Sequence, residues 1–314
     1  MGAGGSHSTP GGPEWLSVLR DAATRGKNRV YSGVDRLRGY PWLRREFARR
    51  VGHPPQLDPP RTLNEKVTWR KLHVRDPLYA VISDKVALRG HLAAVLGAGR
   101  AAPLLTDLLG VSDRPTAEWL AGFGTGIAIK ANHASGWNLF VREGETPDWE
   151  TLARIARHWL RRRYGVRKQE WAYSQVRPRI LVERLLTFPD GRLADDLKFW
   201  VFDGICRVQQ IEHDRFGTPA QGIYDRDWKQ FPLRLRADAG VAAPVPPPAR
   251  LEELRALAEE IAAGHDYLRV DFLMTESRFA LNELTIYRGS GMNRFVPDHY
   301  DREFGDLWTL GGLR

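Results

Sequence analysis

The chain has 314 residues, a length typical of two domains or of one domain with subdomains. Hydrophobic residues make up 42% of it, which is enough for a buried core and excludes a wholly disordered chain. The 47 Lys and Arg residues exceed the 38 acidic residues by nine, so we expect an acidic partner: a nucleotide, an acidic glycan, nucleic acid or an anionic membrane surface.

The single cysteine, Cys206, excludes an internal disulfide and a cysteine-rich zinc site. No apolar run approaches the roughly 20 residues of a membrane span. The first residues, MGAGGSHSTPGGPEW, have neither the basic nor the apolar region of a secretory signal. We therefore expect a cytoplasmic protein.

The N-terminal part is predicted to be a tail followed by a charged arm. Residues 1–13 are rich in Gly, Ser and Pro, which predicts a disordered tail. Residues 14–60 are predicted to form a basic helical arm, because residues 1–50 contain ten Lys or Arg and four acidic residues. Such an arm either docks on an anionic glycan or on the inner face of a membrane, or is simply a solvated charged surface.

A helical lead-in is predicted over residues 61–97, after the proline-rich boundary HPPQLDPPR. Thr62 and Glu65 have the spacing of a capping box and open the first helix. A second helix is predicted over 77–97, ending at Gly97.

The middle of the chain changes to the pattern of strands. Residues 126–131 and 137–143 are short, apolar and rich in strand-forming residues, and predict a hairpin. A helix is predicted over 148–164, and a strand follows at 179–186.

The last third predicts two more hairpins. The strands LKFWVFDG and CRVQQIEHD flank an Asp203-Gly204 turn, and strands 267–274 and 278–287 follow a helix at 250–264. The order of elements predicts an α+β fold with mostly antiparallel sheets. It lacks the alternation of a Rossmann fold and its glycine-rich motif.

Two carboxylates in the last hairpin are the strongest functional signal. Adjacent antiparallel strands bring Asp271 and Glu283 together, and two nearby carboxylates stay ionised when a hard cation such as Mg²⁺ lies between them. The alternative is a pair of strand acids matched by Arg269 and Arg278.

Three further charged residues are weaker candidates. Lys130 lies near the end of an apolar strand, before the loop NHASGWN. A lysine in this position either contacts a phosphate or is a plain surface residue, and the phosphate contact is favoured only in combination with other signals. Glu183 fits either ribose binding at a junction or an ion pair with Arg184. Lys198 alternates with apolar neighbours in its strand, so it needs an anionic partner.

Together these residues lie in stretches that resemble the ATP-grasp superfamily, and more closely the TupA-like ATP-grasp group, which is linked to polysaccharide biosynthesis. The resemblance covers about residues 60–300 in nine ordered stretches: LNEKVTWRKLHVRDPLY (63–79), DKVALR (84–89), IKANHASGWN (129–138), RPRILVERLL (177–186), DDLKFWVFDG (195–204), DRF (214–216), YDRDW (224–228), YLRVDF (267–272) and NELTIYRGSG (282–291).

The resemblance implies an ATP-grasp fold, in which two α+β subdomains with antiparallel sheets clamp ATP. The first subdomain is expected over 98–182 and the second, with the metal site, over 183–314. Residues 61–97 are the helical lead-in. The large N-terminal substrate domain of longer family members has no counterpart here.

The resemblance also assigns roles to residues. ATP would be bound by Lys130, Asn132, His133, Ser135, Gly136, Glu183 and Lys198, and Mg²⁺ by Asp271, Glu283 and Thr285. The catalytic residues would be Arg269, Lys198 and Arg288. The substrate would contact Arg215, Gly289, Ser290 and Gly291.

This chain departs from the common pattern at two positions. Many ATP-grasp enzymes have Glu-x-Asn at the last metal ligands, whereas this chain and TupA-like proteins have Thr, here Thr285. Family members often have Thr-Pro before Gly-Ser-Gly, but this chain has Tyr287-Arg288, which adds a positive charge and indicates an acidic substrate.

The implied activity is an ATP-dependent ligation of a carboxylate to an amine through an acylphosphate. The expected partners are a nucleotide, an acidic small molecule or glycan, and an amine; nucleic acid is not expected, because no nucleic-acid-binding signature is present. Two alternatives remain: a phosphotransferase acting on a hydroxyl group, and a weakly catalytic nucleotide-binding accessory protein of a glycan assembly system.

Overall fold

The computed structural model describes residues 37–213, 220–235 and 243–311. The predicted tail at 1–13, the first part of the predicted arm and the predicted substrate residue Arg215 lie outside these ranges. Within them, no helix is long and apolar enough to cross a membrane.

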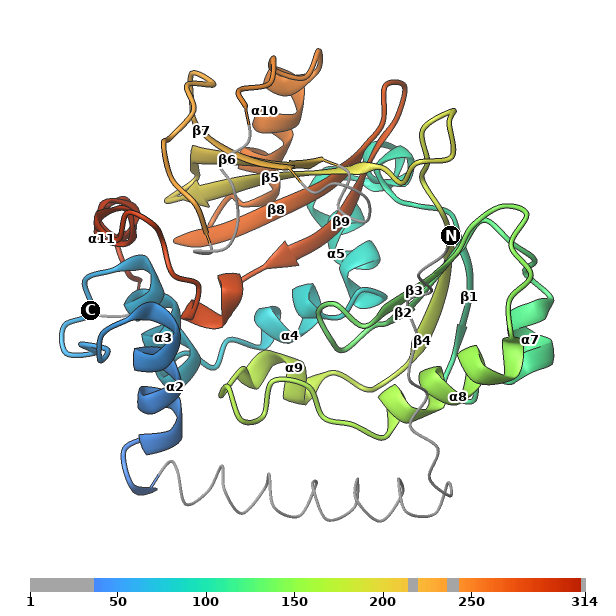
Figure 1. Ribbon diagram of the computed structural model, residues 1–314, viewed down its shortest axis with the longest axis horizontal. Coiled ribbons are helices and arrows are strands. Elements are labelled where there is room, and N and C mark those ends of the chain that lie inside the picture. The colour runs from blue at the N-terminus through green and yellow to red at the C-terminus, as the bar shows by residue number, and fades with distance from the viewer. Residues whose placement is uncertain (1–36, 214–219, 236–242, 312–314) are drawn as a thin grey trace, which may run out of the picture.

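Two antiparallel sheets organise the described part of the chain (Figure 1). The first has the order β1-β4-β2-β3 and consists of β1 (Leu108–Ser112), β2 (Ile127–Ala131), β3 (Asn138–Val141) and β4 (Ile180–Arg184). The second has the order β7-β6-β5-β8-β9 and consists of β5 (Asp195–Phe202), β6 (Ile205–His213), β7 (Ala220–Asp225), β8 (Tyr267–Met274) and β9 (Phe279–Thr285).

The first sheet confirms the predicted hairpin, because Ile127 pairs with Val141 and Lys130 with Asn138. Helices α7 (Ala117–Ala121) and α8 (Trp149–Leu160) lie along its side away from the second sheet (Figure 1). Helix α9 (Trp171–Gln175) packs instead into the main hydrophobic core through Ala172. Small residues of α8 pack against the apolar residues of β2 and β4, and these form a core of their own.

The second sheet contains both hairpins that the sequence predicts. Asp203 and Gly204 have φ angles of 47° and 81°, as a two-residue turn that matches the twist of its strands requires. Helix α10 (Leu251–Ile261) covers one face of this sheet with its apolar side (Figure 1). The main hydrophobic core lies around this sheet.

The predicted arm contains the helix α2 (Pro41–Val51), and the predicted lead-in contains α3 (Leu63–His73), α4 (Pro77–Ser83) and α5 (Ala87–Leu96). The short helix α6 (Ala98–Ala101) and the 3₁₀ turn η1 (Ala102–Leu104) follow, at the start of the first predicted subdomain. The capping box is present: Thr62 accepts a hydrogen bond from the Glu65 N–H, and Glu65 accepts one from Thr62. Helix α4 lies between the two sheets and contacts α9 and β9 (Figure 1).

Helix α3 presents a buried polar side to the C-terminal part of the chain. Asn64 donates hydrogen bonds to Asp301 in α11 (His299–Asp306), and Arg70 donates to the carbonyl groups of Tyr267 and Ile286. These contacts fix the segment after β9, which includes the 3₁₀ turn η2 (Arg288–Gly291).

The structure corrects two predictions about the elements. The predicted helix 77–97 is two helices, because the Asp84 carboxylate accepts a hydrogen bond from the Val86 N–H and ends α4. The sequence pattern also missed β1, β7 and α11. The subdomain boundary predicted at 182/183 stays a prediction, but Glu183 itself lies inside β4 of the first sheet.

Candidate functional site

One face of the second sheet carries a row of charged side chains. Directly paired residues of antiparallel strands point to the same side of a sheet. Asp271 of β8 pairs with Lys198 of β5 on one side and with Glu283 of β9 on the other. In the next row, Arg269 pairs with Trp200 and Thr285. We call this surface the catalytic face.

Arg269 bridges the two carboxylates. It donates two hydrogen bonds of 2.7 and 2.6 Å to Asp271, and its Nη2 lies 3.4 Å from Glu283 and 3.2 Å from the Thr285 hydroxyl. Arg278, the second cation that could have matched these acids, instead contacts Asp107, 3.2 Å away. The two acids thus converge on one cation.

Burial controls the charge of this cluster. It raises the pKa of Asp271 to about 7, against the effect of Arg269. Burial acts in the same direction on Glu283, but the cations Lys85, Arg269 and Lys198 outweigh it and lower the pKa of Glu283. A further cation beside these carboxylates would therefore favour their charged forms.

The donor set fits Mg²⁺. Asp271, Glu283 and Thr285 offer only oxygen ligands, and Mg²⁺ commonly takes one or two carboxylates and completes its shell with phosphate and water. The described residues contain no cluster of three or more His, Cys, Asp or Glu side chains that could hold a metal ion.

The first sheet contributes a second charged cluster. Lys130 of β2 lies 2.8 Å from Glu183 of β4, and Arg89 of α5 lies 3.2 Å from the same carboxylate. Burial acts to raise the pKa of Glu183, but Lys130 reverses this, and the net shift is downward. Lys130 also lies 3.4 Å from the Asn282 side chain in β9, and this contact joins the two sheets.

A small cavity of about 50 Å³ opens beside this contact. Its walls come from both sheets and from the segment that joins them: Thr106, Ala128, Lys130, Asn138, Phe140, Arg184, Leu185, Leu186, Leu193, Ala194, Asp196, Leu273 and Asn282. Its walls are partly apolar with charged residues among them, but its volume is well below the several hundred Å³ of a pocket that encloses a whole ligand.

The loop after β2 is fixed by its own contacts. The Asn132 side chain is buried and bonds to Asp84 and to the backbone of Arg177 and Arg179. His133 is also buried, with Nε2 3.2 Å from the Trp159 carbonyl oxygen. The contacts of these two buried side chains therefore hold the loop in place.

The next residues of this loop are more accessible. Ser135 is half-buried and hydrogen-bonds to the Tyr164 hydroxyl, and Gly136 is exposed with a φ of 76°. Lys85, two residues before α5, donates a hydrogen bond to the Ala134 carbonyl oxygen. The charge of Lys85 also helps to lower the pKa of Glu283 on the catalytic face.

The turn η2 is the candidate substrate loop. Ser290 has a φ of 58°, and its carbonyl oxygen accepts a 2.6 Å hydrogen bond from the buried Lys71 of α3. Gly291 has a φ of 63°, and a Cβ there would lie 2.6 Å from the Asn64 carbonyl oxygen. The neighbouring Arg288 is fully buried.

Lys198 has an acidic partner, as its position in a buried strand requires. Its ammonium lies 2.6 Å from Glu212 of β6, and Gln210 donates a 2.7 Å hydrogen bond to the same carboxylate. Lys198 therefore faces the side of the sheet that carries Asp271.

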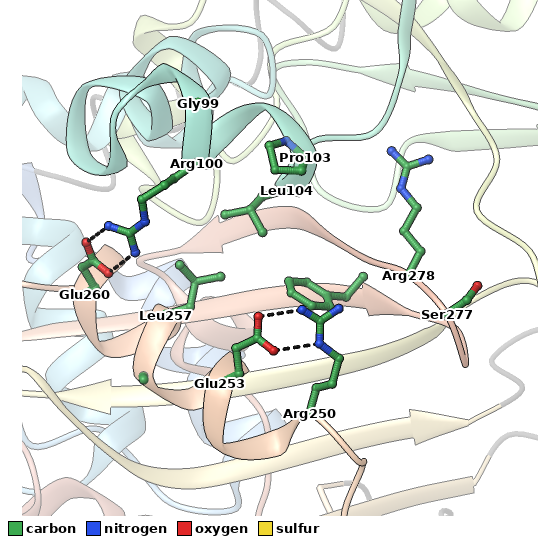
Figure 2. A pocket seen from close by; sticks show the side chains of 12 residues that line it. Gly99, Arg100, Pro103, Leu104, Arg250, Glu253, Leu257, Glu260, Ser277 and Arg278 are labelled. Carbon is green, nitrogen blue, oxygen red and sulfur yellow. Dashed lines mark hydrogen bonds and ion pairs between the residues drawn. The ribbon is translucent and has the colours of Figure 1, made fainter.

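A larger cavity, of about 860 Å³, lies between α6, α10 and the β8–β9 turn (Figure 2). Four of its charged side chains pair among themselves, Arg100 with Glu260 and Arg250 with Glu253, and the fifth, Arg278, pairs with Asp107 outside it. No residue of the catalytic face lines it. We assign it no part in the chemistry.

Two antiparallel sheets with helices, joined by charged contacts where they meet, form the α+β architecture of the ATP-grasp fold. The model of the TupA-like ATPgrasp family matches residues 65–309, and the chain belongs to that family. No curated protein sequence matches the chain.

Several solved structures are similar to the chain. The ATP-grasp ligase PsnB, complexed with a minimal precursor, is 14% identical with a TM-score of 0.39 over 74% of this chain and 60% of that chain. D-alanine–D-alanine ligase from Bacillus anthracis is 13% identical with a TM-score of 0.39, over 73% and 66%. The chain thus spans about 60 to 66% of these proteins.

The structure adds residues that the sequence did not single out. Arg89 and Asn282 each contact a member of the two charged clusters, and the charge of Lys85 helps to lower the pKa of Glu283. Lys85 and Arg89 lie in DKVALR, one of the stretches that carry the family resemblance. The resemblance of this stretch was therefore the signal in the sequence that could have identified them.

Proposed function

We propose that the protein is an ATP-dependent ligase that joins a carboxylate to an amine, in the biosynthesis of a polysaccharide or a related cell-surface polymer. The observation that carries this proposal is the convergence of Asp271, Glu283 and Arg269 on one face. The Lys130–Asn282 contact brings the first sheet to the same place. The link between the TupA-like group and polysaccharide biosynthesis supports the role in polymer biosynthesis. We place the reaction in the cytoplasm or at the inner face of a membrane.

In this proposal the nucleotide lies between the two sheets, with part of it in the small cavity beside Lys130 and Asn282. Glu183 accepts hydrogen bonds from the ribose, while Lys130 reaches the phosphates and the adenine. Lys85, Lys198 and the backbone of the loop at Ser135 and Gly136 neutralise and orient the phosphate chain, which is the main requirement of phosphoryl transfer.

Mg²⁺, when bound by Asp271, Glu283 and Thr285, neutralises charge on the transferred phosphate. An oxygen of the acid substrate attacks the γ-phosphorus and the bond to the β–γ bridging oxygen breaks, so ADP leaves and an acylphosphate forms. The amine then attacks the carbonyl carbon, phosphate leaves, and the amine nitrogen releases a proton to solvent. Arg269 stabilises the negative charge that develops in both steps.

The test is ADP release from Mg²⁺-ATP with a panel of amino acids and uronic acids, each with and without amines. Glu283→Gln removes a metal ligand and is expected to lower the rate at least 100-fold with little change in melting temperature. The matched control is Glu276→Gln, an exposed acid in the turn of the same hairpin, which should keep the wild-type rate.

Three results would contradict the proposal. Normal turnover in Glu283→Gln would rule out the metal assignment. Release of ADP with a hydroxyl acceptor, giving a stable phosphorylated product, would establish a phosphotransferase instead. Thermal stabilisation by Mg²⁺-ATP without turnover on any acceptor, including glycan polymer, would establish an accessory protein.

A further inference from the structure

Arg288 is a buried cation without a hydrogen-bonding partner. Its residue is 1% exposed, and none of its three guanidinium nitrogens has a hydrogen-bond partner within the described ranges of the chain. Buried arginines almost always bond to a carboxylate, a carbonyl group or water, because an unpaired buried charge is costly. Something outside the described chain must therefore complete this site.

Two aromatic rings cover the guanidinium group. Its central carbon lies 4.0 Å from the centre of the Trp200 ring and 4.8 Å from that of Phe295. Such contacts use the faces of the guanidinium plane and leave the N–H groups at its edge free. The edge of a guanidinium is the part that binds a carboxylate through two parallel hydrogen bonds.

Arg288 lies over the catalytic face. Trp200, on which it stacks, pairs directly with Arg269, one row away from the Lys198–Asp271 pair. Rows on one face of a strand are two residues apart, which corresponds to about 7 Å. The two ends of a short dicarboxylate span such a distance.

The acids near Arg288 are already engaged. Asp301 and Glu212 influence Arg288 electrostatically, but Asp301 accepts hydrogen bonds from Asn64 and Glu212 pairs with Lys198. The cation Arg269 and the phenol of Tyr267, which also act on Arg288, offer no negative charge at neutral pH. The missing negative charge therefore has no source among these neighbours.

Other polar groups on the same face are also unpartnered. The indole N–H of Trp200 and the hydroxyl of Tyr267 are buried and lack a hydrogen-bond partner among the described residues. Tyr267 stands two residues before Arg269 in β8 and so shares its face. Both groups can donate to an anion, as Arg288 can.

We propose that Arg288, with the Trp200 indole N–H and the Tyr267 hydroxyl, binds a second, non-reacting carboxylate of the acid substrate, which is therefore a dicarboxylate. This inference rests on the proposed function, because it names the substrate class of that site. The reacting carboxylate lies at Arg269 and the metal ligands, and the second carboxylate sets specificity by pairing with Arg288.

The test measures binding rather than turnover, so that it can fail independently of the ligase assignment. Succinate, glutarate and adipate, and the monoamide of each, are titrated into the protein with Mg²⁺ and a non-hydrolysable ATP analogue. We expect wild type to bind at least one diacid about tenfold or more tightly than its monoamide. Arg288→Met should bring this ratio close to one, and the exposed-arginine control Arg302→Met should keep it.

Arg288→Lys guards against misfolding of the methionine variant. It keeps the positive charge but cannot form two parallel hydrogen bonds with one carboxylate. The ratio of diacid affinity to monoamide affinity should therefore fall only part of the way to one. Equal binding of every diacid and its monoamide by the wild type would overturn the proposal and leave water as the partner of Arg288. An unchanged ratio in both Arg288 variants would also overturn it.

Discussion

Lys85 links the loop after β2 to the catalytic face. Its ammonium donates to the Ala134 carbonyl oxygen, and its charge helps to lower the pKa of Glu283. Burial lowers the pKa of Lys85 itself, which is the behaviour of a lysine that lacks a full set of anionic partners. A triphosphate in the site would supply them.

We predict that Lys85→Met weakens binding of Mg²⁺-ATP about tenfold, the loss expected for one charge-assisted hydrogen bond. Titration calorimetry with a non-hydrolysable analogue measures this directly. The exposed Lys229→Met is the control and should bind like the wild type. An affinity in Lys85→Met equal to that of the control would remove Lys85 from the phosphate site.

The sequence predicted part of the site because some of its geometry is local. Asp271 and Glu283 lie in one hairpin, so strand spacing alone brings them together, and the structure pairs them directly. Asn282 approaches Lys130 across 152 positions of sequence. No local pattern encodes such a contact, which depends on how the two sheets pack.

At the scale of elements, α3 determines where the candidate substrate loop lies. Lys71 donates to the Ser290 carbonyl oxygen, and Arg70 donates to that of Ile286. A change in the position of α3 would therefore displace η2. The capping box at Thr62 fixes the first turn of this helix.

Thr62→Ala should lower the free energy of unfolding by about 1 kcal/mol, because the Glu65 N–H loses its acceptor at the helix start. Urea denaturation measures the change. Thr62→Ser keeps the hydroxyl and is the matched control, expected to lose clearly less. Equal losses in the two variants would mean that the methyl group, and not the cap, stabilises the helix.

The elements that the sequence predicted are those with a local chemical cause. The Asp203-Gly204 turn and the Thr62 cap specify their own geometry. The missed strand β1 has no regular alternation and contains Gly110, where a Cβ would lie 2.6 Å from the Phe123 ring. Its strand conformation depends on pairing with β4, which only the folded chain provides.

At the scale of the whole molecule, three distant segments meet at one buried cluster. Lys71 comes from α3, Ser290 from η2, and Glu170 is the residue that precedes α9. Burial lowers the pKa of Lys71 to about 7, with Glu170 opposing the shift and Lys168 adding to it. Burial also raises the pKa of Glu170. The junction of the lead-in with both sheets therefore contains a lysine that titrates near neutral pH.

This cluster predicts how stability depends on pH. The unfolded chain has Lys71 at its ordinary pKa near 10.4, so between about pH 7 and 10 it binds one more proton than the folded chain. The free energy of unfolding should therefore rise with pH in this window, by up to about 1.4 kcal/mol per unit. Urea denaturation at several pH values should show this rise in the wild type and in the exposed-lysine control Lys229→Met, and a flatter curve in Lys71→Met. Parallel curves for all three proteins would mean that Lys71 keeps its proton in the folded chain, with Glu170 as its charged partner.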